Sequence, residues 1–258
     1  MNNNNLIAWI TGGATGIGLA SAKRLGSLGY TLIISGRRKD ELEKAVNLLT
    51  KDGFVATYIQ VDITNKAQVK KACDSIIDDF KKIDALVCSA GVNLPNKFWK
   101  TINDISIDTI IDTNLKGTTY CISNVLPHMR EAKSGTIVVI SSWSGRYYTS
   151  FTGGLYSASK QALTPLVESI NDQEGINGIR ASVICSGEVA TPILKLRTVP
   201  PPQADIERML KPEDVASAVA YIVQAPSNVC INEVVLSSTY NRAYTGGPDI
   251  RGPNNLNP

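Results

Sequence analysis

The sequence predicts an α/β protein: a single doubly wound parallel sheet of about seven strands, with helices on both faces. Short runs rich in β-branched residues alternate with longer amphipathic segments almost to the end of the 258 residues. Such alternation indicates crossover connections between parallel strands. No linker, repeat or change of composition divides the chain, so we expect one folded domain over residues 1–238.

The elements can be assigned in order along the chain. The expected strands are residues 6–11, 31–35, 56–61, 85–89, 136–141, 180–185 and 234–237. The expected helices are residues 16–28, 39–51, 66–80, 105–132, 156–172 and 212–223. Pro165 should kink its helix, because proline removes a backbone amide. Crossovers of one hand would place ligands at the carboxyl ends of the strands.

Two regions do not follow this alternation. Residues 191–211 contain three consecutive prolines and are long enough to form a lid or substrate loop. Residues 239–258 are rich in Gly, Pro and Asn and cannot form a core of their own. We expect this tail to lie across a neighbouring chain or to be disordered.

Composition excludes several classes of function. Apolar residues make up 43% of the chain and charged residues 19%. The net charge is only +3 and there is no Lys/Arg block, so we expect no nucleic acid and no membrane as partner. No apolar run approaches 18 residues and the start lacks a signal-peptide pattern, which predicts a cytoplasmic protein. Five cysteines without paired spacing are expected to be reduced core residues, and the single His128 leaves no zinc-type ligand set, so we expect no metal.

A glycine-rich turn follows the first expected strand and precedes a helix. Gly12, Gly16 and Gly18 permit a tight turn and a close backbone approach. The helix start offers free amides and partial positive charge to a pyrophosphate. The strand-turn-helix context favours phosphate binding over a merely structural turn, and the lack of a following Gly-Lys-Ser/Thr argues against a Walker-type site.

Tyr156 and Lys160 lie four residues apart, so both side chains leave the same face of the predicted helix. Lowering a phenol pKa from about 10 to about 7 takes roughly 4 kcal/mol. One positive charge about 4 Å away, at an effective dielectric constant of about 20, supplies roughly that energy. Taken alone, the pair also fits a tyrosine packed on a lysine stem. The rest of the chain favours a phenol that exchanges a proton near neutral pH.

Together these motifs resemble the short-chain dehydrogenase/reductase family over roughly residues 6–238. Further matching pieces follow in order: Asp62 after the third strand, Ser89-Ala90-Gly91, Asn114, the serine segment Ser141 to Gly145, Ser186 to Thr191, and Pro212 to Ala216. Three departures are visible. Ser89 replaces the usual Asn, Ser186 replaces the usual Pro, and one extra residue separates serine from tyrosine. Ser142 and Ser144 both fit the serine position, and Ser142 is chosen because the glycine three residues later then aligns.

The resemblance implies a Rossmann-type fold, a hydride-transfer oxidoreductase and a homotetramer or homodimer. It assigns the proton transfer to Tyr156, the carbonyl-oxygen contact to Ser142, phenol activation and ribose binding to Lys160, and a water of the proton relay to Asn114. The cofactor contacts that it implies are Gly12, Thr15, Gly16, Ile17, Gly18, Arg37, Asp62, Ile63, Ser89, Ala90, Gly91, Asn114, Tyr156, Lys160, Val189 and Thr191.

The end of the second strand favours NADP(H) over NAD(H). An acidic residue there would accept from the ribose 2′-hydroxyl and repel a 2′-phosphate. The strand instead ends Ser35-Gly36-Arg37-Arg38. Arg37 can bind a 2′-phosphate, a roughly ten- to hundred-fold preference, although both arginines also fit solvated positions. Thr15 occupies the turn position that is often basic in NADP-preferring relatives.

The substrate is expected to be a small hydroxy/oxo compound. Beside Ser142 and Tyr156, four cations are candidates for meeting an anionic group on it: Arg146, Lys195, Arg197 and Arg242. The alternative is that they are solvated surface charges. Trp143 fits either a pocket wall or the core. A non-catalytic NADP(H)-sensing regulator is the main competing class, and a nucleotide-sugar epimerase is disfavoured because the chain is short for the extra carboxy-terminal domain.

Overall fold

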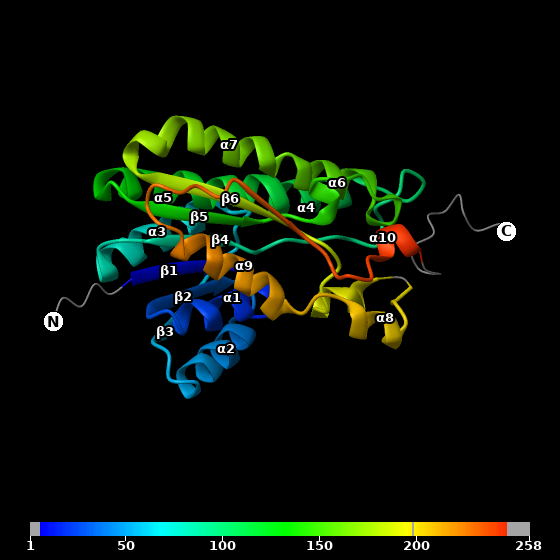
Figure 1. The fold of residues 1–258 in the computed structure, drawn as a ribbon, viewed down its shortest axis with the longest axis horizontal. Helices are drawn as coiled ribbons and strands as arrows, with labels where there is room; N and C mark the ends of the chain where they lie inside the picture. Colours follow the sequence, from blue (N-terminus) through cyan, green and yellow to red (C-terminus); the bar gives the residue numbers. More distant parts are fainter. Residues whose placement is uncertain (1–5, 198, 247–258) are drawn as a thin grey trace.

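The computed structural model describes residues 6–197 and 199–246. They form one parallel sheet in the order β3-β2-β1-β4-β5-β6-β7, confirming the predicted fold class (Figure 1). The strands are β1 (Leu6–Thr11), β2 (Tyr30–Gly36), β3 (Ala56–Gln60), β4 (Ala85–Cys88), β5 (Gly135–Ile140), β6 (Ile179–Ser186) and β7 (Glu233–Leu236). The strand order reverses between β1 and β4, and a doubly wound sheet binds ligands at such a point.

Helices cover both faces of the sheet (Figure 1). They are α1 (Gly16–Gly26), α2 (Lys39–Lys51), α3 (Lys66–Phe80), α4 (Asp104–Ile111), α5 (Thr118–Ala132), α6 (Gly154–Gln161), α7 (Leu163–Glu174), α8 (Gln203–Arg208), α9 (Pro212–Gln224) and α10 (Arg242–Thr245). None of the helices in the described residues is long and apolar enough to cross a bilayer.

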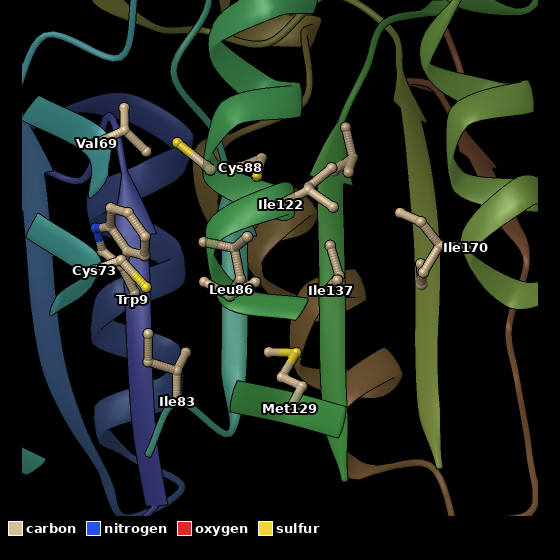
Figure 2. Close-up of a cluster of buried hydrophobic side chains, with 14 of the residues drawn as sticks. Trp9, Val69, Cys73, Ile83, Leu86, Cys88, Ile122, Met129, Ile137 and Ile170 are labelled. Carbon is tan, nitrogen blue, oxygen red and sulfur yellow. The ribbon is translucent and has the colours of Figure 1, made fainter. Parts of the chain in front are cut away.

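Two apolar cores result from the alternation of side chains along each strand. In β1, Trp9 points to the core under α3, α5 and α7, whereas Ala8 and Ile10 face α1, α2 and α9. Figure 2 shows the first core, in which Trp9, Leu86 and Ile137 of neighbouring strands lie under the helices. Four cysteines are buried as expected, but Cys230 is exposed.

The helix expected over residues 105–132 is divided into three parts. A π-helical segment, Asp112–Gly117, separates α4 from α5. It holds Asn114, whose side chain bonds to the loop after β4, and the Thr118 hydroxyl donates to the Asn114 carbonyl oxygen at 3.0 Å. These side-chain contacts favour a local departure from α geometry, which is common at functional sites. The sequence pattern carried no sign of it.

The helix expected over residues 156–172 begins at Gly154 and is interrupted at Ala162, between α6 and α7. Pro165 explains the break, because it has no amide to donate to the carbonyl of Gln161. The described part of residues 191–211 contains regular structure. This segment contains a 3₁₀ turn, Pro192–Leu196, and helix α8. A β-bridge between Val189 and Leu210 joins the two ends of the segment.

The tail prediction was wrong for the part that the structure describes. Residues 239–246 pack on the domain through α10, and Arg242 is only 2% exposed. The physical reason is electrostatic: Arg242 lies near the carboxylates of Glu188 and Asp205, 3.6 and 3.5 Å from its Nε. The remainder of the tail lies outside the described residues.

Candidate active site

A cleft with a volume of about 410 Å³ opens at the carboxyl ends of the strands. Its walls come from the segments that follow β1 to β6, completed by the turn around Phe151 and by residues next to α10. Strand ends of a parallel sheet converge on one edge, so residues far apart in sequence meet here.

The glycine turn forms one end of the cleft. Gly12 has a φ of +66°, and a Cβ there would lie 2.8 Å from the Ala90 backbone. A Cβ on Gly18 would lie 2.3 Å from the carbonyl oxygen of Gly12, so the turn and α1 touch directly. Thr15, the residue before α1, makes no side-chain cap, and the first turn of α1 has no acidic residue. Thr15, Gly16 and Ile17 line the cleft. Backbone amides at the start of α1, which no side chain caps, therefore face the cleft. This arrangement fits a pyrophosphate group.

The next part of the cleft lies beyond β2 and β3. The Gln60 side chain donates to the carbonyl oxygen of Arg37 at 2.8 Å, which fixes the chain as it leaves β2. Arg37 and Arg38 line the cleft and are exposed. Asp62 accepts from the Thr64 amide at 3.0 Å and from its hydroxyl at 2.8 Å. The end of β2 therefore presents cations and no carboxylate, while Asp62 lines the wall after β3.

Asn114 connects the loop after β4 with α6. Its Oδ1 accepts from the Val92 amide at 2.8 Å, and its Nδ2 donates to the Val92 carbonyl at 2.9 Å and to Ser159 Oγ at 3.1 Å. Asn114 is fully buried and is not part of the cleft wall. Through these contacts Asn114 holds the loop after β4 against α6, the helix that carries Tyr156.

Lys160 is buried beside the end of β5. Its Nζ donates to the Ile140 carbonyl at 2.9 Å, and the Ser141 hydroxyl donates to the Lys160 carbonyl at 2.9 Å. A Cβ on Gly91 would lie 3.2 Å from that Nζ. The glycine thus lets the loop after β4 approach the amine, which also lines the cleft.

Tyr156, on the same helix face, forms a hydrogen bond with Ser142. Ser142 also accepts from the Ser144 amide at 3.2 Å. The Ser144 hydroxyl, in contrast, bonds to the hydroxyls of Thr149 and Thr152. Of the two serines that fitted the sequence pattern, Ser142 is therefore the one beside the phenol.

The electrostatics of the pair differ from the sequence-based expectation. Burial raises the pKa of Tyr156 above its ordinary 10, opposed by the Ser142 hydrogen bond and by the charge of Arg197. Burial also lowers the pKa of Lys160 to about 8. The two effects share a cause, since removal from water disfavours a phenolate and an ammonium alike. The Tyr156 phenol is thus protonated at neutral pH.

The cleft collects most of the residues that the sequence predicted. Of the expected cofactor contacts, all except Gly18 and Asn114 line it. Arg197 also lines it, and its Nη1 lies 2.7 Å from Glu188 Oε1. Trp143 forms part of the wall.

The remaining substrate candidates are placed differently. Arg146 is exposed and paired with Glu233 at 3.5 Å, and neither it nor Arg242 is part of the cleft wall. Lys195 lies in the 3₁₀ turn Pro192–Leu196, but its side chain is outside the described residues.

Sequence reasoning did not single out every residue of the cleft, and Lys97 and Phe151 are two that it missed. Both line the cleft. The guanidinium carbon of Arg197 lies 5.7 Å from the centre of the Phe151 ring. Both residues come from irregular segments, where no periodicity or motif marks a side chain as pocket-lining.

Comparison with known proteins identifies the class. The sequence model of the short chain dehydrogenases matches residues 6–199. An uncharacterized oxidoreductase of Staphylococcus saprophyticus is 34% identical over 237 residues, covering 89% of this chain and 96% of the relative. One of Listeria monocytogenes is 32% identical over 248 residues, covering 93% and 98%. The chain therefore belongs to the short-chain dehydrogenase family and is an oxidoreductase of that family.

Solved structures agree with the fold. The alcohol dehydrogenase of the archaeon Thermococcus sibiricus, complexed with 5-hydroxy-NADP, superposes with a TM-score of 0.83 at 26% identity, covering 93% of this chain and 99% of that one. The closed form of a serine dehydrogenase complexed with NADP⁺ gives a TM-score of 0.81 at 28% identity, covering 90% and 94%.

Proposed function

We propose that the protein is an NADP(H)-dependent oxidoreductase that interconverts a small hydroxy compound and its carbonyl, as an alcohol dehydrogenase or carbonyl reductase does. The observation that carries this proposal is the hydrogen bond between Tyr156 and Ser142 at a cleft that also contains the Lys160 amine and the uncapped start of α1. Proton donor, hydrogen-bonding partner and phosphate site share one cavity.

In the direction of reduction, Tyr156 donates its hydroxyl proton to the carbonyl oxygen, which becomes the alcohol oxygen. NADPH, when bound, supplies the hydride that the carbonyl carbon accepts. Ser142 donates a hydrogen bond to the same oxygen and holds it beside the phenol. The protonated phenol of Tyr156, whose pKa is raised, is the form that this donation requires.

Lys160 and Asn114 support the tyrosine. The position of the Lys160 amine beside Gly91 and the Ile140 carbonyl supports a role in binding the nicotinamide ribose. Asn114 holds the loop after β4 against α6 and would seat the relay water through this segment.

The preference for NADP(H) is supported by charge. Arg37 and Arg38 stand where a 2′-phosphate would lie, and β2 ends without a carboxylate. Two structural relatives above 25% identity contain NADP or an NADP derivative. A single guanidinium–phosphate pair favours the phosphorylated cofactor by about ten- to a hundred-fold.

The Tyr156→Phe variant tests the proposal. We expect NADPH oxidation with a panel of small aldehydes and ketones to fall by at least about a hundred-fold, because proton transfer is lost. NADPH binding, followed by fluorescence, should stay within about twofold, because binding energy comes from the phosphate end. Near-normal turnover in this variant would contradict the assignment. NADPH binding by the unmodified protein without oxidation by any carbonyl would favour the sensing regulator instead.

A further inference from the structure

Lys97 is a cation that the proposed reaction does not use. It belongs to the loop between β4 and α4, is half-buried and lines the cleft. Its position is fixed by close packing: a Cβ on Gly153 would lie 2.6 Å from the Lys97 carbonyl oxygen and 2.9 Å from its Cβ. Gly153 has a φ of +86° and directly precedes α6. Lys97 is therefore held at the amino end of the helix that carries Tyr156.

The same loop is tied to this region by a second contact. The Asn93 side chain donates to the Thr152 carbonyl at 3.0 Å. Both ends of the Lys97 segment are thus anchored to the turn that leads into α6. The backbone of Lys97 is therefore held next to the helix that carries the phenol.

Lys97 lacks a carboxylate partner among residues 6–197 and 199–246. Its contact there is with the ring of Phe98, whose centre lies 5.6 Å from Nζ. Glu188, a carboxylate of the described cleft wall, is already balanced by Arg197 at 2.7 Å and by Arg242 at 3.6 Å. A partly desolvated cation without a counter-ion is unfavourable unless a ligand supplies the charge.

The energetics of the amine agree with this geometry. Burial and, to a lesser extent, the charge of Arg197 lower the pKa of Lys97 to about 8. Arg197 influences both Lys97 and Tyr156, so all three lie within short electrostatic range. The cleft wall also includes the apolar side chains of Leu94, Phe151 and Leu194. A compact molecule with an apolar middle and a charged end fits this space.

We infer that Lys97 is a substrate-binding residue that receives a carboxylate, so that the enzyme acts on small hydroxy and oxo acids. The inference rests on the proposed function for the reacting end of the molecule. The carboxylate would accept from the Lys97 ammonium, and the hydroxyl or carbonyl group would lie at Tyr156 and Ser142. The substrate anion would restore the charge balance that the chain itself leaves incomplete at Lys97.

Matched pairs of substrates test this assignment. NADPH oxidation is measured with C3–C6 oxo acids and with the primary amide of each, which has nearly the same shape without the charge. The unmodified enzyme should prefer the acid by about ten- to a hundred-fold in kcat/KM, the range of one charge-assisted hydrogen bond. Lys97→Met should remove that preference by lowering kcat/KM for the acid alone. Lys100→Met, which removes an exposed lysine of the same loop, should change neither value.

A binding measurement completes the experiment without depending on turnover. The protein saturated with NADP⁺ is titrated calorimetrically with the corresponding hydroxy acids, and Lys97→Met should weaken binding at least about tenfold. Equal losses for acid and amide, or unchanged acid binding in Lys97→Met, would overturn the inference while leaving the oxidoreductase intact. Tight acid binding without oxidation or reduction of any pair would instead refute the proposed function and keep the anion site.

Discussion

The buried amine of Lys160 should leave a measurable mark on the pH dependence of stability. Burial lowers its pKa from 10.5 in water to about 8 in the folded chain. Between these two values the unfolded chain binds more protons than the folded chain. The free energy of unfolding therefore rises with pH across this window, because deprotonation removes the cost of a buried charge. A lysine with an ion-pair partner would show the opposite sign.

The magnitude follows from the two pKa values. At about 1.4 kcal/mol per pH unit, the full window corresponds to about 3 kcal/mol, of which about 2 kcal/mol falls between roughly pH 7.5 and 9.5. The Lys160→Met variant isolates this contribution, because every other titrating group is present in both proteins. Urea unfolding of each protein, without cofactor, gives the free energy at each pH.

The expected result is a difference curve that favours the unmodified protein increasingly as the pH rises. Lys100→Met, which removes an exposed lysine, serves as the matched control for the Lys-to-Met substitution itself. A flat difference curve for Lys160→Met would show that the Lys160 amine keeps a normal pKa in the folded chain. The reasoning from burial would then be refuted.

Two further predictions concern the nucleotide end. Arg37→Ala should lower kcat/KM for NADPH by about ten- to a hundred-fold and leave kcat/KM for NADH unchanged. Equal losses with both cofactors would remove Arg37 from phosphate recognition. Gly12→Ala should weaken NADPH binding at least about tenfold, since a Cβ there meets the Ala90 backbone at 2.8 Å with φ at +66°. Fluorescence titration measures it, and unchanged affinity would mean that the turn does not hold the phosphates.

The parts of the site that could be predicted from the sequence are those that depend on the spacing of residues close together in the chain. Tyr156 and Lys160 share a helix face by periodicity, and the glycine turn lies between a strand and a helix. The strands were placed to within one or two residues because buried parallel strands are continuous apolar runs. These features depend on neighbours in the chain, which a sequence displays directly.

Features that depend on distant partners could not be predicted. Arg146, Arg197 and Arg242 look equivalent in sequence, yet Arg146 pairs with Glu233, which lies 87 residues further along the chain (233 minus 146). Only Arg197 of the three lines the cleft. Lys97 carries no motif, and its place at the cleft depends on packing against Gly153. The direction of the Tyr156 pKa shift was predicted wrongly for a similar reason. Residue spacing reveals a neighbouring charge, but it does not reveal that burial removes the phenol from water and raises its pKa.

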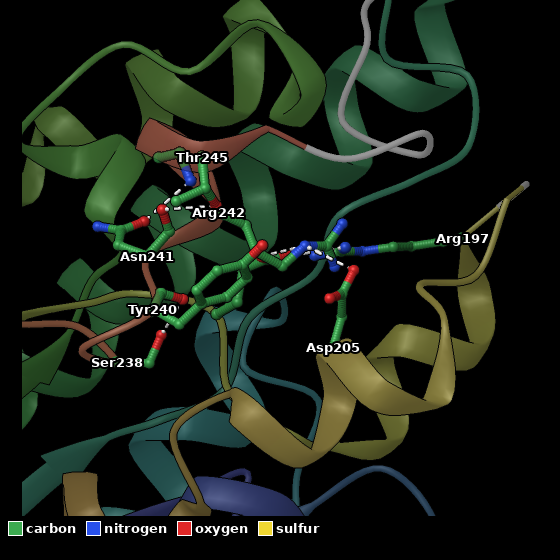
Figure 3. A network of polar contacts seen from close by, with 9 residues as sticks. Arg197, Asp205, Ser238, Tyr240, Asn241, Arg242 and Thr245 are labelled. Atoms are coloured by element: carbon green, nitrogen blue, oxygen red, sulfur yellow. Dashed lines mark hydrogen bonds and ion pairs between the residues drawn. The ribbon is translucent and has the colours of Figure 1, made fainter.

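The buried guanidinium of Arg242 joins three segments of the chain. Its partners, Glu188 and Asp205, belong to the strand-end loop and to α8, and Figure 3 shows Arg242 and Asp205 facing each other across the gap between α10 and α8. Separating a buried charge from its partner is unfavourable by about 3–5 kcal/mol. Displacement of α8 alone would separate Asp205 from Arg242. We therefore expect α8 and α10 to stay joined at this side of the cleft when molecules enter or leave it.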